Sequence, residues 1–523
     1  MSTLWPRYAS PDDLPAIEST PLADRGLPDA TYDLLKRAAD LWPHRKAITF
    51  LPDVTWTFSD LLRNVHGYAN SFQRQGFRRT DAIALMSGDR QVMIPALLAA
   101  QLVGIAMPIN PALSAEHVHE LLARSGARIP DLSDPGPSTF DGDRPRSTDL
   151  AAYFHTGGTT GAPKLAAHTH ANEVANAWML AANELLDEDA VLFAALPLFH
   201  VNALIVTLLT PLFQGQHVVW AGPLGYRDPA LYGEFWQIVE RHRITTMSAV
   251  PTVYSVLAQC PVDADISSLR FAMVGAAPLP PAVRSAFETH TGVPLVEGYG
   301  LTEATCASAR SFPDAPRPGS VGQRLPYQQV KIQADGVLAI SGPTVFAGYV
   351  TSPNELEPPG EWLDTGDLAT VDDDGFIRLS GRAKDLIVRG GHNIDPAVIE
   401  DALLSHPAVT AASAVGRPDV HAGEVPVAYV TLAGEATAEE LREWAQARVP
   451  EKAAAPKEVV VLDALPLTAI GKPYKVELRA DATRRVFQDL DVEVVIEDGA
   501  VVVLAAQEAT SALEQHTVLW RHK

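Results

Sequence analysis

Hydrophobic and polar positions along the first three hundred residues follow two alternating periods. Residues 55–58 alternate in the manner of a strand, and a helical pattern follows them and closes at Gly76. Short apolar runs recur between helical segments, at 82–86, 106–109, 190–196, 245–250, 271–274 and 295–298. This alternation predicts an α/β fold in which parallel sheets are covered by helices.

The pattern changes twice in the second half of the chain. Residues 313–345 contain more Pro and Gly and only short alternating pieces, which predicts a small β subdomain. After Arg382 strand and helix signals restart, which predicts a small α+β domain of about 100 residues. We expect an N-terminal domain at 1–382, a hinge at 383–385, a C-terminal domain at 386–482 and an extension at 483–523. The extension carries a hairpin signal around 498–499 and a final helix.

Composition and charge narrow the classes of partner. Lysine and arginine number 41 against 63 acidic residues, so the net charge is 41 − 63 = −22, which argues against a nucleic-acid partner. The two cysteines, Cys260 and Cys306, form no Cys-x-x-Cys pair, and a reducing compartment fits them. The N-terminus has no signal-peptide core, and the apolar run 194–213 contains polar residues and prolines. We therefore expect a cytoplasmic protein that is not integral to a membrane. The oligomeric state stays open, with a homodimer as one alternative.

A dense glycine and threonine segment follows an apolar approach at 150–154. It consists of Thr156, Gly157, Gly158, Thr159, Thr160 and Gly161, and Lys164 comes after a proline. Glycines let backbone N–H groups turn toward an anion, threonine hydroxyls add donors, and the lysine adds charge. The spacing is not that of a Walker A loop. The composition favours a polyphosphate-binding loop over a flexible surface loop.

This segment resembles the phosphate loop of the adenylate-forming superfamily, which contains AMP-forming acyl-CoA synthetases, luciferases and the adenylation domains of peptide synthetases. The usual motif begins Thr-Ser-Gly, and Gly157 stands here in place of the serine. Four further motifs of that family follow in the expected order, and the resemblance covers about residues 30–485. The family usually has another strand and helix before the loop, where this chain has only a polar connection at 128–149.

The resemblance implies a nucleotide site for ATP and AMP. Gly298, Tyr299 and Gly300 would face the purine, and Thr302 would donate to a phosphate or carboxylate. Glu303 would hold Mg²⁺. Asp367 would accept hydrogen bonds from the ribose, with Arg382 beside it, and Ala276, Ala277 and Pro278 would complete the site.

The resemblance also implies roles for the second half of the chain. Lys472 would be the catalytic lysine of adenylation, although Pro473 follows it where the family usually has Ile or Val. Lys384 would be the hinge about which a mobile C-terminal domain rotates. Arg389, Gly390 and Gly391 would then line the channel for CoA, because glycines leave room for its pantetheine arm.

The acyl pocket is expected beside His200, which would act as a catalytic residue. A buried, hydrogen-bonded histidine of the core would explain the same position equally well. Its other walls are expected from Val201, Ala203, Val250, Thr252, Gly275 and Ala276. These residues include no charge that could pair with a substrate amine, so the resemblance points to a bulky hydrophobic carboxylic acid. The expected reaction activates that small-molecule acid with ATP and Mg²⁺ as an acyl-adenylate and transfers it to CoA.

Two alternatives within the family remain at this point. Gly157, Pro473 and the short connection before the loop would also fit an enzyme that only converts preformed acyl-AMP into its CoA thioester. An acyl-AMP ligase that loads a carrier protein is the second, although the short spacing between Gly348 and Arg382 leaves no room for that group's insertion. A sensor that kept the fold without the chemistry would bind acyl-AMP without turnover.

Overall fold

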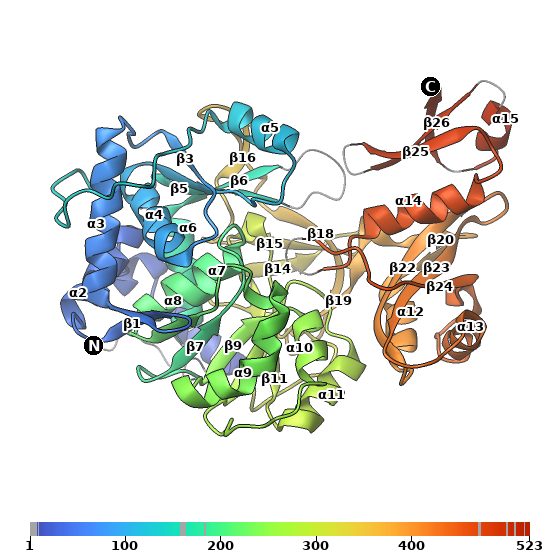
Figure 1. Ribbon diagram of the computed structural model, residues 1–523, viewed down its shortest axis with the longest axis horizontal. Helices are drawn as coiled ribbons and strands as arrows, with labels where there is room; N and C mark the ends of the chain where they lie inside the picture. Colours follow the sequence, from blue (N-terminus) through green and yellow to red (C-terminus); the bar gives the residue numbers. More distant parts are fainter. Residues whose placement is uncertain are drawn as a thin grey trace.

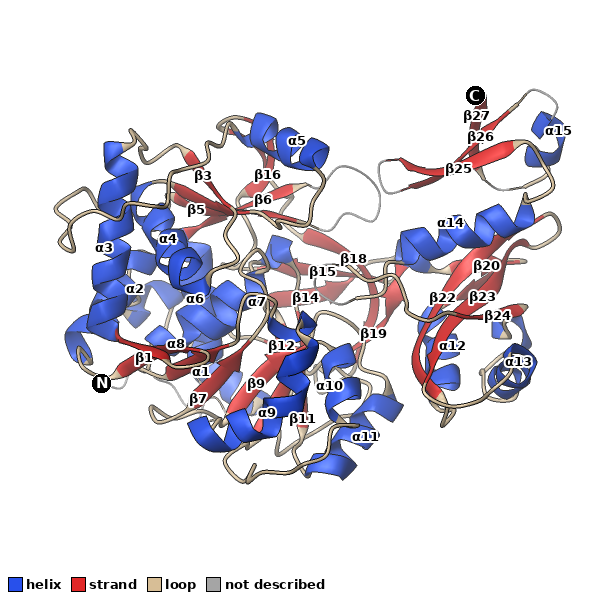
Figure 2. Cartoon of the chain, viewed as in Figure 1, coloured by secondary structure: helices blue, strands red, loops and turns tan. Residues whose placement is uncertain are grey.

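The computed structural model describes residue 8 and residues 10–156, 164–182, 185–468, 472–497, 500–506, 509–516 and 518–522. Within them two large sheets, a small β sheet and two C-terminal sheets follow one another (Figures 1 and 2). No helix in this part of the chain combines the length and apolar character needed to cross a bilayer.

The first large sheet has nine strands and is parallel through its centre. Its strand order is β13 (Gln323–Arg324), β12 (Ala309–Arg310), β11 (Leu295–Tyr299), β10 (Phe271–Val274), β9 (Thr246–Ala249), β7 (Val191–Ala194), β8 (His217–Trp220), β1 (Lys46–Phe50) and β2 (Val54–Thr57). Because parallel strands present their carboxyl ends at one edge, the segments after β9, β10 and β11 meet there.

The second large sheet has six strands, parallel from β3 to β5 and antiparallel beyond. The order is β17 (Glu355–Glu357), β16 (Gly348–Ser352), β6 (Leu165–Thr169), β5 (Leu150–His155), β4 (Ile105–Pro108) and β3 (Ala82–Leu85). β5 and β6 form the hairpin that carries the glycine and threonine segment. Where the family usually has another strand, only Arg128 bridges to Ile83, and 128–149 is a connection without helix or strand.

The helices of the large domain bury apolar faces against these sheets in one extended core, except α5, which packs in a second core cluster beside the six-stranded sheet. They are α1 (Leu14–Glu18), α2 (Thr31–Leu41), α3 (Phe58–Arg74), α4 (Arg90–Val103), α5 (Ala115–Ser125), α6 (His170–Ala181), α7 (Val201–Leu204), α8 (Thr210–Leu212), α9 (Pro229–His242), α10 (Pro251–Leu257) and α11 (Pro281–Thr291). Ser114 caps α5, where the sequence predicts a helix start. α3 begins at Phe58 with Thr57 as its cap, and not at Ser59 after a strand over 55–58, because Thr57 and Asp60 form a capping box. A π-helix, Ile205–Leu209, joins α7 to α8 in the run 194–213.

Smaller units complete the chain. The β subdomain is the antiparallel sheet β14 (Gln329–Ile332), β15 (Val337–Ser341), β18 (Leu363–Val371) and β19 (Ile377–Arg382). The small domain contains β20 (Ile387–Arg389), β21 (His392–Ile394), β22 (Val409–Asp419), β23 (Gly423–Leu432) and β24 (Glu458–Val461), with α12 (Pro396–Leu404), α13 (Ala438–Gln446) and α14 (Lys475–Val486). It has its own core, separate from that of the large domain.

The C-terminal extension forms a third unit beside α14, seen in red at the right of Figure 1. β25 (Val492–Glu497) and β26 (Ala500–Ala505) pair antiparallel, as the hairpin signal predicts. The predicted final helix is only the four-residue α15 (Thr510–Leu513). A further strand, β27 (Leu519–His522), follows it and pairs parallel to β26.

Candidate active site

A continuous cleft of about 2740 Å³ lies between the large domain and the small domain. Thr156 and Lys164 line it, and the Thr156 N–H donates to the Lys164 carbonyl at 2.8 Å, which closes the neck of the predicted phosphate loop. Gly157, Gly158, Thr159, Thr160 and Gly161 lie outside the described residues. The neck nevertheless fixes where the loop leaves and re-enters the sheet.

A tyrosine joins the phosphate lysine to the predicted magnesium ligand. The Tyr349 hydroxyl donates to Glu303 Oε1 at 2.8 Å, and Lys164 Nζ lies 4.5 Å from the centre of the Tyr349 ring. Burial and the Glu303 carboxylate raise the pKa of Tyr349, so this hydroxyl remains a donor. No group of three or more His, Cys, Asp or Glu side chains among the described residues could hold a metal. A magnesium ion at Glu303 would therefore need phosphate or water oxygens as further ligands.

The nucleotide end of the cleft is organised around Asp367, which is 7% exposed. Its two carboxylate oxygens accept from the Tyr299 hydroxyl at 2.7 Å and from Arg382 Nε at 2.9 Å. Burial and Asp367 together raise the pKa of Tyr299. The Asp367 carboxylate can still accept hydrogen bonds from a ribose, because each of its oxygens has a second lone pair.

Backbone geometry explains two of the small residues near Tyr299. A Cβ at Gly300 would lie 1.6 Å from the Cys306 carbonyl oxygen, so only glycine fits there. A Cβ at Gly275 would approach the Gly298 carbonyl oxygen to 3.2 Å. Ala276 has a φ of 69°, which is unusual for a residue with a side chain. Ala277 and Pro278 follow it along the wall of the cleft.

Lys472 reaches the large domain from the small one. Its side chain lies close enough to Arg382 and Asp367 to interact with their charges, and close enough to His200 to disfavour a charge on that ring. Burial, followed by Arg382, lowers the pKa of Lys472 to about 8. The backbone on either side is a tight hairpin, in which the Lys472 N–H donates to Thr468 Oγ1 and the Lys472 carbonyl accepts from the Thr468 N–H. The extended geometry that Pro473 favours is part of this hairpin, because Pro473 bridges to Leu467.

Two histidines line the cleft beside the lysine. His200 Nδ1 accepts from the Asn202 N–H at 3.3 Å, so in the neutral ring Nε2 carries the hydrogen. Burial, then Lys472 and His155, lower the pKa of His200 to about 3. His155 accepts from the Asn110 N–H, and burial lowers its pKa to about 4. Both rings are therefore neutral at physiological pH.

Most of the predicted acyl-pocket residues line the cleft. They are His200, Val201, Val250, Thr252, Gly275 and Ala276. Ala203 is an exception: it is fully buried and is absent from the cleft wall, and its carbonyl accepts from the Thr207 hydroxyl. Ala203 is the third residue of the short helix α7, and its side chain packs in the core.

The predicted CoA residues lie apart from the cleft in this domain arrangement. Gly390 and Gly391 have φ values of 57° and 87° in the turn between β20 and β21. The Arg389 guanidinium donates to the carbonyls of Ala453 and Ala455. Lys384, in contrast, does line the cleft, and burial followed by Arg382 lowers its pKa.

Sequence reasoning missed several residues that build this site. Tyr349 follows a glycine in β16, which is a weak local signal, and its link to Glu303 appears only in three dimensions. His155 precedes the glycine and threonine segment directly, and its position at the end of an apolar strand could have marked it as a cleft residue.

Comparison with known proteins agrees with this geometry. The family of AMP-binding enzymes matches residues 35–130 and 131–350, and the C-terminal domain of AMP-binding enzymes matches 398–472. The chain therefore belongs to the adenylate-forming family of AMP-binding enzymes. The relatives below place it more narrowly: it is an AMP-forming acid–CoA ligase, which activates a carboxylic acid through an adenylate.

The marinolic acid–CoA ligase of Pseudoalteromonas sp. (strain SANK 73390) is 36% identical, over 91% of this chain and 85% of that protein. The feruloyl-CoA synthase of Amycolatopsis sp. is 32% identical, over 85% of this chain and 97% of that protein. Among solved structures, o-succinylbenzoate CoA synthetase from Bacillus subtilis with its acyl-adenylate intermediate has a TM-score of 0.75 and 28% identity. That match covers 85% of this chain and 97% of the other. The same synthetase has also been solved with ATP and a magnesium ion.

Proposed function

We propose that the acid is bulky and hydrophobic and that its CoA thioester is the product. The observation that carries this proposal is a set of apolar side chains that line the cleft, here called the acyl arm. They come from α6, the segment before β7, β7, the π-helix, the segment after β9 and β10: Leu180, Leu186, Leu192, Val206, Val250 and Met273. None of these six side chains carries a charge, so the arm suits a hydrocarbon or aryl group and not an amino acid.

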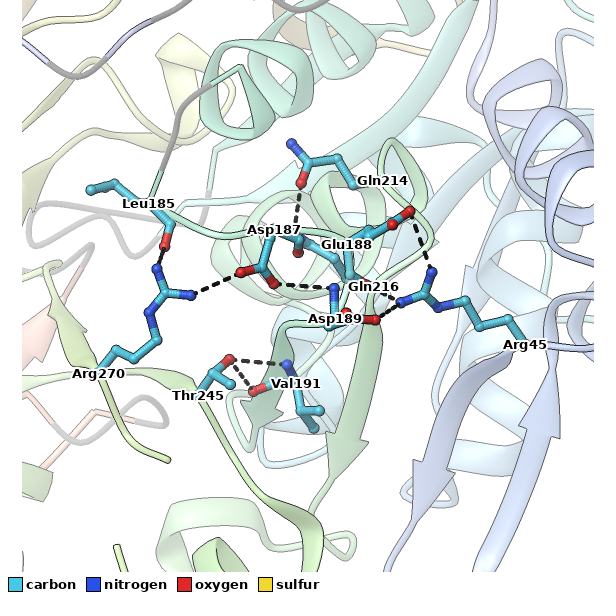
Figure 3. A network of polar contacts seen from close by, with 10 residues as sticks. All are labelled: Arg45, Leu185, Asp187, Glu188, Asp189, Val191, Gln214, Gln216, Thr245 and Arg270. Carbon is cyan, nitrogen blue, oxygen red and sulfur yellow. Dashed lines mark hydrogen bonds and ion pairs between the residues drawn. The ribbon is translucent and has the colours of Figure 1, made fainter. Parts of the chain in front are cut away.

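The segment 185–191, which carries Leu186, takes part in a network of polar contacts (Figure 3). Arg270 donates to the Leu185 carbonyl at 2.7 Å and to Asp187, whose backbone carbonyl also accepts from Gln216. Arg45 pairs with Asp189 at 2.7 Å. These contacts hold the segment that carries Leu186 against β1, β8 and β10, which supports a preformed arm.

The roles in adenylation follow from charge and position. The neck residues Thr156 and Lys164 would hold the ATP phosphates, and Glu303 would hold Mg²⁺, which neutralises phosphate charge when it is bound. Asp367 and Arg382 would hold the ribose. Lys472 would stabilise the charge that develops as the carboxylate attacks the α-phosphorus, and the His200 Nε2–H would donate to the acyl oxygen.

Thioester formation would use a second arrangement of the two domains. Rotation about Lys384 would withdraw Lys472 and bring Arg389, Gly390 and Gly391 to the cleft, where the CoA thiolate attacks the acyl-AMP and AMP leaves. The position of Lys472 inside the cleft counts against an enzyme restricted to the second step. The proposed domains are 1–382, the hinge 383–385, 386–482 and 483–523.

The test is a panel of carboxylic acids of increasing length, assayed with ATP and CoA for thioester formation by mass spectrometry. We expect product with bulky hydrophobic acids and little with acetate or amino acids. Val250→Trp should block the acyl arm and lower kcat/KM for the best long acid at least about tenfold, while its effect on the shortest accepted acid stays within about threefold. Equal losses for short and long acids would contradict the assignment of the arm. Pyrophosphate exchange without thioester would contradict CoA as acceptor.

A further inference from the structure

A chain of buried polar side chains leads from the interior of the large domain to the catalytic Thr302–Glu303 pair. Gln101, His168 and Glu173 are each fully buried. Gln101 Nε2 donates to Glu173 Oε2 at 2.6 Å, and Glu173 Oε1 lies 3.6 Å from His168 Nδ1. His168 Nε2 in turn lies 2.8 Å from the Thr302 carbonyl oxygen. None of these three side chains belongs to the substrate-binding set described above.

The chemistry of the contacts fixes the hydrogens. A carbonyl oxygen can only accept, so His168 Nε2 carries a hydrogen and donates it to Thr302. The other face of the ring meets a carboxylate oxygen in a site without water contact. His168 Nδ1 and Glu173 Oε1 lie 3.6 Å apart, which is too long for a hydrogen bond, and neither atom has a hydrogen-bond partner among the described residues. The ring is therefore held by its bond to Thr302 on one side and packs beside the Glu173 carboxylate on the other.

The Thr302 carbonyl needs this anchor because its segment has irregular backbone. The same oxygen accepts from the Thr305 N–H at 3.0 Å, so the histidine supplies the second hydrogen bond. Thr305 has a φ of 66°, outside regular helix and strand geometry. Glu303 is tied on its other side, since its carbonyl accepts from the Phe346 N–H at 2.9 Å.

The histidine bond also connects two sheets. His168 lies on β6, the strand that follows the phosphate loop in the six-stranded sheet. Thr302 follows β11 of the nine-stranded sheet. The distance between the phosphate loop and the Thr302–Glu303 pair therefore depends on this contact, together with Tyr349 on the neighbouring strand β16.

We propose that His168, oriented by Glu173 and Gln101, is a positioning residue that sets Thr302 and Glu303 against the phosphate loop for binding of Mg·ATP. This inference rests on the proposed function, in which those two residues meet the nucleotide. It acts on the first half-reaction, because acyl-AMP no longer carries the pyrophosphate that the loop and Glu303 would hold. A displacement of catalytic groups by about 1 Å is enough to cost on the order of 100-fold in rate.

The experiment compares matched variants of the full chain. His168→Phe removes the donor to Thr302, whereas His168→Gln places an amide nitrogen where Nε2 was. Glu173→Leu removes the support of the ring, whereas Glu173→Gln keeps a donor toward Nδ1. Asn176→Leu is the control on the same helix as Glu173: it deletes two buried hydrogen bonds to Ala307 but none to Thr302.

Calorimetric binding of Mg·ATP is the first readout, because it requires no acid. We expect His168→Phe and Glu173→Leu to raise the Kd at least about tenfold and to lower pyrophosphate exchange by at least as much. Thioester formation from synthetic acyl-AMP should stay within about threefold. His168→Gln, Glu173→Gln and Asn176→Leu should bind Mg·ATP within about threefold of the unaltered protein, although Asn176→Leu lowers the unfolding temperature.

Unchanged Mg·ATP binding in His168→Phe would overturn the proposal, as would an equal loss in Asn176→Leu. An equal loss of both half-reactions would overturn it as well. If His168→Phe fails to fold, the comparison of His168→Asn with His168→Gln replaces it. The asparagine nitrogen lies where Nδ1 was and cannot reach Thr302, so His168→Asn should lose Mg·ATP binding that His168→Gln keeps. Failure of the unaltered protein to make any thioester would sink the proposed function alone, because the binding comparison stands without it.

Discussion

The pKa of Lys472 makes adenylation sensitive to pH in a way that can be calculated. The amine is charged below its pKa, and burial lowers that pKa from 10.5 to about 8. Its protonated fraction therefore falls from about 0.9 at pH 7 to about 0.1 at pH 9, which is about tenfold. If only the charged amine stabilises the transition state, kcat/KM for pyrophosphate exchange falls by the same factor, because kcat/KM reports the ionisation of the free enzyme.

The assay is pyrophosphate exchange between pH 6.5 and 9.5 with the best acid from the panel. Lys472→Ala should lower the rate by about 100- to 1000-fold at pH 7 and leave thioester formation from acyl-AMP far less affected. Lys472→Arg should keep a flat profile up to pH 9.5, because a guanidinium stays charged there. His200, with a pKa of about 3, is neutral throughout and contributes no slope.

Two results would refute this reasoning. A flat profile in the unaltered protein would mean that the charge of Lys472 does not matter in the rate-determining step. An alkaline fall that persists in Lys472→Arg would assign the titration to another group. Lys384 is the alternative to examine then, because it lines the same cleft and its pKa is also lowered by burial.

Three further predictions concern single positions. Gly300→Ala should destabilise the large domain by about 2–4 kcal/mol in denaturant titration, because its Cβ would lie 1.6 Å from the Cys306 carbonyl oxygen. Gly233→Ala is the control, since its Cβ would lie in open space on α9, and it should not destabilise the protein. Asp367→Asn should raise the KM for ATP about 10- to 100-fold at unchanged KM for the acid, and an unchanged ATP KM would remove Asp367 from the ribose site. Arg389→Ala should raise the KM for CoA about tenfold and leave pyrophosphate exchange unaltered, and a loss in exchange would show that its contacts with Ala453 and Ala455 matter only for folding.

The sequence is most informative about motifs and elements that are made of contiguous residues. The glycine and threonine segment needs no distant partner to be recognised, and Thr365-Gly366-Asp367, which lies in β18, is likewise a contiguous motif. The prediction of parallel sheets covered by helices is confirmed, because strand and helix periods alternate regularly. Each of these signals lies within about ten residues of chain.

Contacts between distant segments are what the sequence could not provide. Gln101, Glu173, His168 and Thr302 belong to four different elements, and each alone reads as an ordinary polar residue. The parallel pairing of β27 with β26 is similar, since only the strand after α15 completes that sheet. Side-chain direction is a third case: Ala203 lies three residues from His200 but faces the core.

The contacts on the two sides of the cleft differ in kind, and this difference bears on how a single site could serve two reactions. On the large-domain side, Thr302, Glu303 and Asp367 are each fixed by hydrogen bonds from other elements. On the small-domain side, the backbone of Lys472 bonds to Thr468, and the Tyr474 N–H donates to the Pro466 carbonyl. Between the domains, the Ser255 hydroxyl donates to the Thr410 carbonyl at 3.4 Å.

Exchanging Lys472 for another face of the small domain would break the long hydrogen bond between Ser255 and Thr410. Arg479 and Asp385 pair at 2.9 Å within the small domain and its hinge, so they can move as one body with α14. The nucleotide-binding groups would meanwhile keep their geometry, because their anchors all lie in the large domain and its β subdomain. A nucleotide half that keeps its geometry and a lysine-bearing half that moves would suit a two-step ligase, since the acyl-adenylate must stay in place while its surroundings change.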